Sequence, residues 1–288
     1  MGVVPTMPGC RISGLGTDCT PTGRARCHHG PVRLLRSVLC GVVLCLGLVS
    51  CSSPPPTPPA SPPPATGPGA AQLADWKLTL PTVGKNGNAD TVNPARVSPP
   101  WLTTDAGDNL VFWAPVGGAT TAHSEHARTE LDSLQDFPAG AGPHGLTASV
   151  SVGQVPSGGR SVIIGQIHGA DDLSAVPFVM LFYTAGALQV VVKQQQSGEQ
   201  HLDYPLLADV PVGARFDYGI RDNGDGSLTF TASYNGQHAS TTAPLPAAFR
   251  AASVRFQAGA YQQDSSDAAT AAPDDGARVT FYALQTAA

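Results

Sequence analysis

The chain has 288 residues, of which 42% are hydrophobic and only 13% charged, enough for one large domain or two small ones. Charge is unevenly distributed: residues 70–288 hold 11 lysines and arginines against 20 aspartates and glutamates, a net charge of −9. Because a nucleic-acid-binding protein needs a basic face to neutralise phosphates, this balance argues against nucleic acid as a partner.

Residues 1–51 have the pattern of an N-terminal extension followed by an export signal. Basic residues precede an apolar run over 37–49, which is too short to span a bilayer and ends in Leu48-Val49-Ser50-Cys51. This ending resembles the lipobox of bacterial lipoproteins, whose cysteine is lipidated, so Cys51 is the expected lipidation site. An ordinary signal peptide is the alternative. Either pattern predicts a protein outside the cytoplasm, secreted or held at the membrane only through a lipid anchor.

Residues 52–69 are nearly all Pro, Ser, Thr, Ala and Gly, a composition typical of a semi-extended tether. The folded domain is therefore expected over residues 70–288. All six cysteines lie before residue 52, so this domain forms no disulfide of its own and must be held together by its core.

Short apolar patterns with turn residues between them follow one another through the domain, and no convincing amphipathic helix interrupts them. Strands are expected at residues 73–81, 110–113, 128–131, 146–152, 161–168, 176–183, 188–194, 215–221, 227–234, 253–261 and 277–284. Glycine- and asparagine-rich hairpin turns are expected at 222–226 and 235–236. Many strands at short spacing predict an all-β fold, an antiparallel β-sandwich of two sheets.

The strand expected at residues 161–168 carries Gln166 and His168 on one face, since successive side chains alternate. A buried amide and a buried imidazole each need hydrogen-bond partners. The pair therefore belongs either to a polar network or to a groove that binds a ligand.

The strand at 128–131 places Arg128 and Glu130 on one face by the same alternation. They form either a surface ion pair, which contributes little to stability, or a cation fixed by a carboxylate within a groove.

A third polar face is expected on the strand at 253–261, where Arg255, Gln257 and Tyr261 alternate with apolar residues. The small residues Gly259 and Ala260 are expected to leave room for a ligand beside the strand. Tyr261 is either part of the site or an ordinary rim aromatic.

A cation, an amide, an imidazole and a phenol, namely Arg128, Gln166, His168 and Tyr261, suit proton abstraction next to a carboxylate. Donors aimed at the carboxylate stabilise the enolate that develops when the neighbouring proton leaves. A nearby cation makes a phenol a better proton donor and acceptor near neutral pH, which fits Tyr261 for acid or base work.

Three segments in this order, Arg128-Thr129-Glu130-Leu131, Gln166-Ile167-His168 and Phe256-Gln257-Ala258-Gly259-Ala260-Tyr261-Gln262-Gln263, resemble the motifs of the alginate lyases of polysaccharide lyase family 7. The resemblance spans residues 73–286. It implies a jelly roll with a concave substrate cleft and metal-independent β-elimination on an anionic polysaccharide. A monomer that needs no cofactor is expected. Carried onto this chain, Arg128, Gln166 and His168 hold the carboxylate and Tyr261 is the acid, and also the base where the substrate is mannuronate. His168 would be the base for guluronate. In the family, isoleucine at the position of Ile167 is loosely associated with activity on guluronate-containing chains, so this substrate is slightly favoured.

The chain departs from the family pattern at Gln257, where a lysine is usual, and at Asp132, where an arginine is common. Lys193, Arg255 and Arg278 are expected to restore positive charge to the groove. The residues expected to bind substrate are Glu130, Lys193, Arg255, Gln257 and Gln263. A less densely charged uronan such as glucuronan is the alternative substrate.

Two other functional classes and a metal site remain as rivals. A non-catalytic carbohydrate-binding module would need exposed aromatic platforms, but the domain has only three tryptophans. A glycosidase needs two facing carboxylates, and Glu130 has no evident partner. His123, Glu125, His126 and His168 contain metal-binding residue types, but their spacing matches no familiar site, so no metal is expected.

Overall fold

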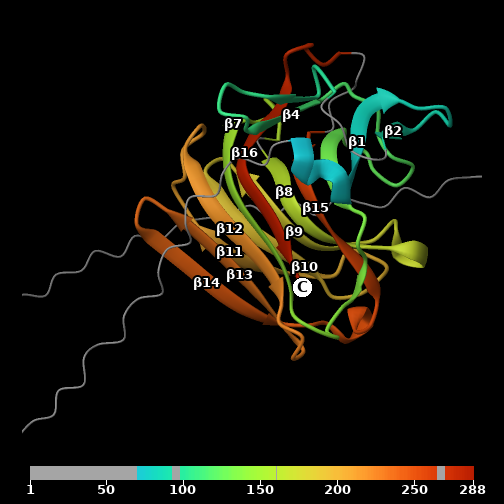
Figure 1. Ribbon diagram of the computed structural model, residues 1–288, viewed down its shortest axis with the longest axis vertical. Coiled ribbons are helices and arrows are strands. Elements are labelled where there is room, and N and C mark those ends of the chain that lie inside the picture. Colours follow the sequence, from blue (N-terminus) through green and yellow to red (C-terminus); the bar gives the residue numbers. More distant parts are fainter. Residues whose placement is uncertain (1–69, 93–97, 160, 265–269) are drawn as a thin grey trace, which may run out of the picture. The chain divides into compact units, whose positions relative to one another are not determined.

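The computed structural model describes residues 70–92, 98–159, 161–264 and 270–288 (Figure 1). The expected extension, signal and tether, with Cys51, lie outside the described residues. Within the described part, no helix is long and apolar enough to cross a membrane.

The larger of two antiparallel sheets carries the three polar motifs (Figure 1). Its strands follow the order β11-β10-β9-β8-β15-β5-β1-β2, and the short β6 also pairs with β15. They are β1 (Trp76–Val83), β2 (Ala89–Val92), β5 (Arg128–Ser133), β6 (Phe137–Pro138), β8 (Ser161–Gly169), β9 (Pro177–Thr184), β10 (Ala187–Lys193), β11 (His201–Leu207) and β15 (Ser253–Gln262).

The second sheet has seven strands in the order β14-β13-β12-β7-β16-β4-β3. They are β3 (Leu102–Thr104), β4 (Leu110–Pro115), β7 (His144–Gln154), β12 (Arg215–Asp222), β13 (Ser227–Tyr234), β14 (Gln237–Pro244) and β16 (Gly276–Ala287). The helical elements among the described residues are three short 3₁₀ turns, η1 (Ala70–Asp75), η2 (Asp171–Leu173) and η3 (Ala247–Phe249). The predicted antiparallel β-sandwich is confirmed.

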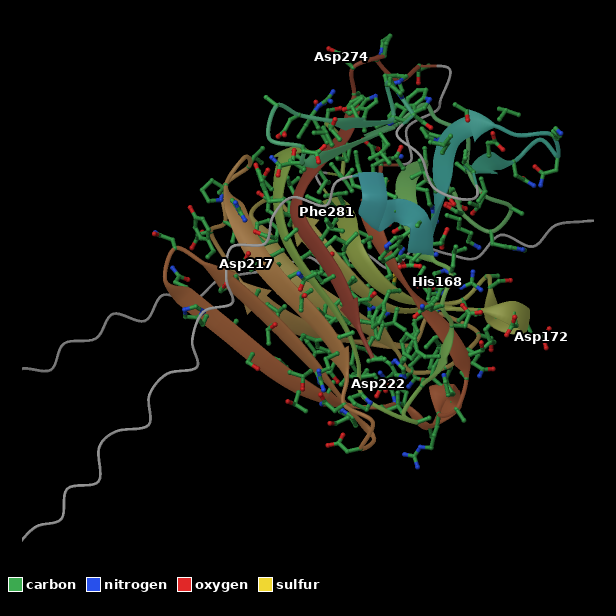
Figure 2. All side chains as sticks on the ribbon, viewed as in Figure 1. His168, Asp172, Asp217, Asp222, Asp274 and Phe281 are labelled. Atoms are coloured by element: carbon green, nitrogen blue, oxygen red, sulfur yellow. The ribbon has the colours of Figure 1, made fainter. Side chains whose placement is uncertain are left out.

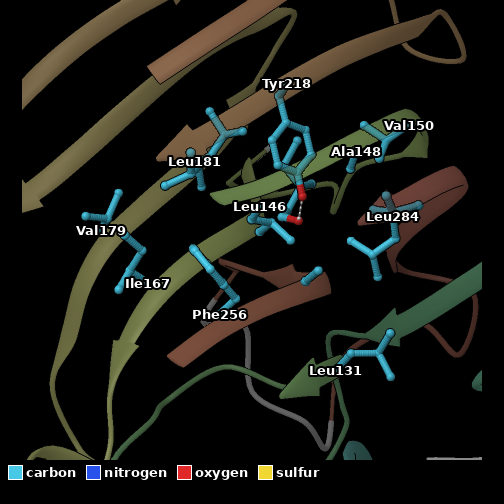
Figure 3. Packing of buried hydrophobic residues seen from close by; sticks show 14 of the residues in the cluster. Leu131, Leu146, Ala148, Val150, Ile167, Val179, Leu181, Tyr218, Phe256 and Leu284 are labelled. Carbon is cyan, nitrogen blue, oxygen red and sulfur yellow. Dashed lines mark hydrogen bonds between the residues drawn. The ribbon is translucent and has the colours of Figure 1, made fainter. Parts of the chain in front are cut away.

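The hydrophobic core fills the space between the sheets (Figure 3). Alternation along each strand supplies it: Leu131, Ile167 and Phe256 of the larger sheet are at most 3% exposed, while their neighbours in sequence face the other way. Each polar motif therefore has an apolar face that anchors it, and its polar face is turned away from the second sheet.

Gly165 of β8 lets Tyr218 of β12 reach across the core. The Tyr218 hydroxyl donates a hydrogen bond to the carbonyl oxygen of Ile164 at 2.8 Å (Figure 3). A Cβ atom at Gly165 would lie 2.7 Å from that hydroxyl oxygen, closer than van der Waals contact allows. Burial raises the pKa of Tyr218, so the phenol stays neutral.

The structure adds strands that the sequence pattern did not predict, and shortens the first one. Residues 73–75 belong to η1, so the strand expected from residue 73 begins at Trp76. The unpredicted strands are short or mostly exposed, and hydrophobic alternation is therefore weak in them; they are β2, β3, β6, β11 and β14. Both predicted hairpin turns are confirmed, between β12 and β13 and between β13 and β14.

Candidate active site

The three motifs lie on adjacent strands, with β15 between β8 and β5. The sheet register therefore aligns their polar residues in rows. Arg255 is opposite His168, Gln257 is opposite both Gln166 and Asp132, Gly259 is opposite Glu130, and Tyr261 is opposite Arg128. Residues from three distant parts of the sequence thus form one polar surface.

Arg128 is the cation at one end of this surface. Its guanidinium carbon lies 3.5 Å from the centroid of the Tyr261 ring, and its Nη1 donates to Glu130 Oε2 at 2.9 Å. Arg128 is 8% exposed and Glu130 only 1%, so the two form a buried pair; the surface ion pair considered from the sequence is excluded. The Nε of Arg128 is buried and has no hydrogen-bond partner among the described residues.

The Tyr261 hydroxyl is held by a loop that the sequence analysis did not connect with it. Ser124 Oγ lies 2.9 Å from the Tyr261 oxygen and donates to the carbonyl oxygen of His126, also at 2.9 Å. Since a serine has one hydroxyl proton, Tyr261 is then the donor to Ser124. No sequence signal marks Ser124, because 137 residues separate it from Tyr261.

A chain of hydrogen bonds runs beneath the surface through the two glutamines. Gln166 Nε2 donates to Glu130 Oε1 and to Gln257 Oε1, each at 2.7 Å. Gln257 Nε2 donates in turn to Asp132, whose other oxygen accepts from Thr79 at 3.2 Å. Gln166 is fully buried, and its Oε1 has no partner among the described residues. Gln166 therefore belongs to a polar network, and this network lies within the candidate site.

Burial changes the proton affinity of Glu130. Loss of solvation raises the pKa of this carboxyl to about 7, although the Arg128 charge acts in the opposite direction. Near neutral pH Glu130 is thus partly protonated, and the positive charge of Arg128 is only partly balanced.

His168 is neutral in this setting. Burial lowers the pKa of its imidazole to about 4, and its Nδ1 lies 3.1 Å from the carbonyl oxygen of Gly169. Because a carbonyl can only accept, Nδ1 carries the proton, and Nε2 is left as an acceptor with no partner among the described residues. This tautomer is the one that a general base requires.

The remaining residues expected at the site differ in their positions. Arg255 lies beside His168, but it forms an ion pair with Asp136 at 2.9 Å, so its charge is compensated. Gln263 follows β15 and donates to main-chain oxygens. Lys193 ends β10, which is separated from β8 by β9, so the structure does not bring it into the cluster.

Two expectations are corrected. Gly259 does not make room for a ligand, because a Cβ atom there would lie 2.5 Å from the backbone oxygen of Thr129; the glycine allows β5 and β15 to approach closely. Arg278 does not contribute to the groove, because it lies on β16 of the other sheet.

A hollow of about 350 Å³ lies farther along the larger sheet. It is lined mainly by β9, β10 and β11, on the side opposite to β5, and its residues are Phe182, Thr184, Ala187, Gln189, Val191, His201 and Asp203. Val191 is opposite Met180, which is opposite Gln166, so the hollow opens on the face that carries the polar motifs. The surface available to a long ligand therefore extends beyond the motif strands.

The structure does not assemble His123, Glu125, His126 and His168 into a metal site. No group of three or more histidine, cysteine or acidic side chains that could hold a metal ion occurs in the part of the chain that is described. His126 is placed instead by its Nδ1, 3.0 Å from the carbonyl oxygen of Asp264.

A family model described as alginate lyase matches residues 71–288, most of the chain and all three motif strands. The chain belongs to the alginate lyase family. This alginate lyase is thus a polysaccharide lyase, as the motifs predicted. No curated protein matches it.

Solved structures agree with this assignment. An alginate lyase from Pseudomonas aeruginosa has a TM-score of 0.65 and 28% identity, over 75% of this chain and 98% of that one. Alginate lyase A1-II′, a member of polysaccharide lyase family 7, has a TM-score of 0.64 and 27% identity, over 75% and 95%. An A1-II′ variant with a histidine replaced by asparagine and a tyrosine by phenylalanine, in complex with the substrate GGMG, has a TM-score of 0.64 and 27% identity, over 78% and 97%.

Proposed function

We propose that this alginate lyase cleaves the 1,4-glycosidic bonds of alginate by β-elimination, leaving an unsaturated uronate at the new end. The observation that carries the proposal is the placement of Arg128 against Tyr261, with a neutral His168 on the same surface. This is the set of groups that proton abstraction beside a carboxylate requires.

In this mechanism the substrate carboxylate lies against Arg128. The guanidinium of Arg128 donates to it and stabilises the negative charge that moves onto the carboxylate when the C5 proton leaves. Gln166 as a further donor stays a prediction, because its amide nitrogen already donates to Glu130 and Gln257 and one of these bonds would have to open.

Tyr261 handles the protons at C5 and O4. In mannuronate these lie on the same side of the ring. The phenolate of Tyr261 can therefore remove the C5 proton, and the phenol so formed can return a proton to O4 as the C4–O4 bond breaks and the C4–C5 double bond forms. Arg128 over the ring face stabilises the phenolate from which the reaction starts and to which it returns. Ser124 aids it by turning its hydroxyl proton from the His126 carbonyl to the phenolate oxygen.

Guluronate presents C5–H and O4 on opposite sides, so a second group must act as the base. We propose His168, whose Nε2 is free to accept the proton while Tyr261 protonates O4. The A1-II′ variant in complex with substrate supports both assignments, because the residue types replaced in it are histidine and tyrosine.

The deciding experiment follows the ultraviolet absorbance of the conjugated product during incubation of residues 70–288 with poly-mannuronate, poly-guluronate, mixed alginate and glucuronan. An increase on an alginate that disappears in the Tyr261→Phe variant is expected. An increase on glucuronan alone would replace alginate with the less densely charged polymer. Retardation by the polymers in an affinity gel without any increase would favour a non-catalytic binding module, although Trp76 and Trp113 are buried and cannot serve as its platforms.

We also propose that the mature protein is held outside the cytoplasm by a lipid on Cys51. Support comes only from the sequence pattern around this cysteine. Metabolic labelling with a fatty acid is expected to mark the full chain and not its Cys51→Ser variant. Release of an unlabelled protein into the medium would show an ordinary signal peptide instead.

A further inference from the structure

The outer face of the seven-stranded sheet carries three exposed arginines that the proposed mechanism does not use. Arg215 and Arg221 lie on β12, and Arg278 lies on β16. None of them forms an ion pair with a described carboxylate. The two arginines of the active-site surface differ in this respect, since Arg128 is paired with Glu130 and Arg255 with Asp136.

Arg215 is held in a fixed orientation. Its guanidinium carbon lies 4.5 Å from the centroid of the Tyr282 ring, and its Nε donates to Ser149 Oγ at 2.8 Å. The Tyr282 hydroxyl is itself hydrogen-bonded with Ser151 Oγ at 3.1 Å. The two terminal nitrogens of Arg215 have no hydrogen-bond partner among the described residues. A planar guanidinium fixed in this way is prepared to bind a carboxylate with two hydrogen bonds.

Arg278 is placed in the same manner at the other side of the face. Its guanidinium carbon lies 4.7 Å from the centroid of a Trp113 ring, and Trp113 is opposite Arg278 on the neighbouring strand β4. The ring is buried, so Trp113 supports the arginine and is not itself a platform for a sugar.

Carboxylates are scarce on this sheet. Its seven strands contain two, Asp217 and Asp222. Asp222 is buried and accepts from the backbone nitrogens of Gly140 and Gly224. Asp217, labelled in Figure 2, faces outward and accepts from Ser233 at 3.3 Å. Three arginines thus outnumber one outward carboxylate on a domain whose net charge is −9.

We propose that this face, defined by Arg215, Arg221, Arg278 and Tyr282, is a second binding surface for the uronate polymer, separate from the active site. The proposal rests on the proposed function, because its ligand is the polymer that the active site cleaves. Strands β12, β7, β16 and β4 are adjacent, and Arg215 is in register with Ser151 and Thr280. The Cα atoms of Arg215 and Arg278 are then about 12 Å apart. They are far enough apart to bind carboxylates of different sugar units in one chain.

Such a surface acts only on long substrates. A polymer bound to the outer sheet keeps the enzyme near further cleavage sites and raises the effective concentration of its own chain at the active site. An oligosaccharide that fills only the active site gains nothing from it. The contribution is electrostatic and exposed to solvent, so it falls as salt concentration rises.

The test compares Arg215→Gln/Arg278→Gln with Arg250→Gln, which removes an exposed arginine between η3 and β15, away from this face. Each set is also made with Tyr261→Phe, so that retardation in alginate-containing gels is measured without cleavage. Removal of two charged contacts is expected to weaken retention about tenfold at low salt. The control keeps wild-type retention. Cleavage of alginate polymer falls in parallel, and cleavage of a short alginate oligosaccharide does not change.

Equal retention of the double variant and the control overturns the second surface, whether or not the enzyme cleaves alginate. Equal loss of oligosaccharide and polymer cleavage also overturns it, because that loss places the effect at the active site. If the wild-type protein neither cleaves alginate nor is retained by it, the proposed function fails as well. Cleavage of the short oligosaccharide tests the proposed function by itself, because it does not involve the second surface.

Discussion

The guanidinium carbon of Arg128 lies 3.5 Å from the centre of the Tyr261 ring, although 133 positions separate the two residues in the chain. They meet because Tyr261 is opposite Arg128 in the pairing of β15 with β5. A cation over the ring stabilises the phenolate form of the tyrosine, and Glu130 accepts a hydrogen bond from that cation. The register of two strands thus assembles the acid–base group with the charge that activates it.

Ser124 is expected to position the Tyr261 hydroxyl. Replacement Ser124→Ala removes a hydrogen bond to the reacting oxygen, so kcat is expected to fall about fivefold and KM to change little. The activity profile is also expected to shift toward higher pH, because the phenolate loses a donor. Ser124→Thr keeps the hydroxyl and serves as the matched control. An unchanged pH profile in Ser124→Ala, or no recovery in Ser124→Thr, would contradict this role.

The charges around Tyr261 bear on the same profile. Arg128 covers one ring face, Glu130 is paired with Arg128, and the His126 ring centre is 6.3 Å from that of Tyr261. Ser124 also bonds the backbone of His126, so Ser124→Thr, which keeps the hydroxyl, separates loss of the bond to Tyr261 from displacement of His126.

Glu130 is expected to make stability depend on pH. Its pKa is about 7 in the folded protein and 4.5 as the reference value, so between these values the folded state binds more protons than the unfolded state. The stability it contributes is complete below about pH 4.5 and is lost as pH rises to about 7. Urea unfolding measures this loss. As pH rises from 4.5 to 7, the free energy of unfolding of Glu130→Gln is expected to increase relative to that of the wild type by up to about 3 kcal/mol.

The exposed carboxylate of Glu125 supplies the control for this measurement. Glu125→Gln is expected to follow the wild-type pH dependence throughout. If the free energies of unfolding of Glu130→Gln and wild type differ by the same amount from pH 4.5 to 7, Glu130 is ionised in the folded protein across the whole window.

His168 is expected to affect guluronate more than mannuronate. If it removes the C5 proton only in guluronate, His168→Gln lowers kcat on poly-guluronate about 100-fold, and lowers kcat on poly-mannuronate much less. Because the pKa of His168 is about 4, its titration is absent from the profile above about pH 5. Equal losses on the two polymers would assign His168 to carboxylate binding alone.

Gly165→Ala is expected to destabilise the protein without touching the active-site face. The new methyl group would collide with the Tyr218 hydroxyl in the core, which costs about 2 kcal/mol in the free energy of unfolding. Removing that hydroxyl in Gly165→Ala/Tyr218→Phe is expected to restore part of the loss. Gly142→Ala, whose added Cβ meets no atom closer than 3.8 Å, is the control. If the double variant loses as much stability as the two single variants together, the collision with the Tyr218 hydroxyl is not the cause of the loss.

Alternation along single strands was enough to predict which residues share a face. Arg128 with Glu130, and Gln166 with His168, are properties of one strand each, and a period of two fixes them wherever the strand lies. Weak alternation explains the failures: β14 is mostly exposed, and β11 contains the proline Pro205 among polar residues, so neither has a clear apolar face.

Pairing between distant strands could not be predicted from the residues themselves, because register depends on packing and on turns far away in the chain. Ser124 reached Tyr261 through a loop, and Gln257 became the link between Gln166 and Asp132. The positive charge of Arg278 can be read from the sequence, but its place on the other sheet cannot.

The sequence by itself determined the all-β class, the three motifs and the residue types that perform the chemistry, since these depend on local pattern and side-chain type. Only the tertiary structure decided which groups touch and what burial does to them. Removing Glu130 and His168 from water shifts their pKa values in opposite senses, and in both cases favours the neutral form. That shift arises from the surroundings of each side chain, which the order of residues does not display.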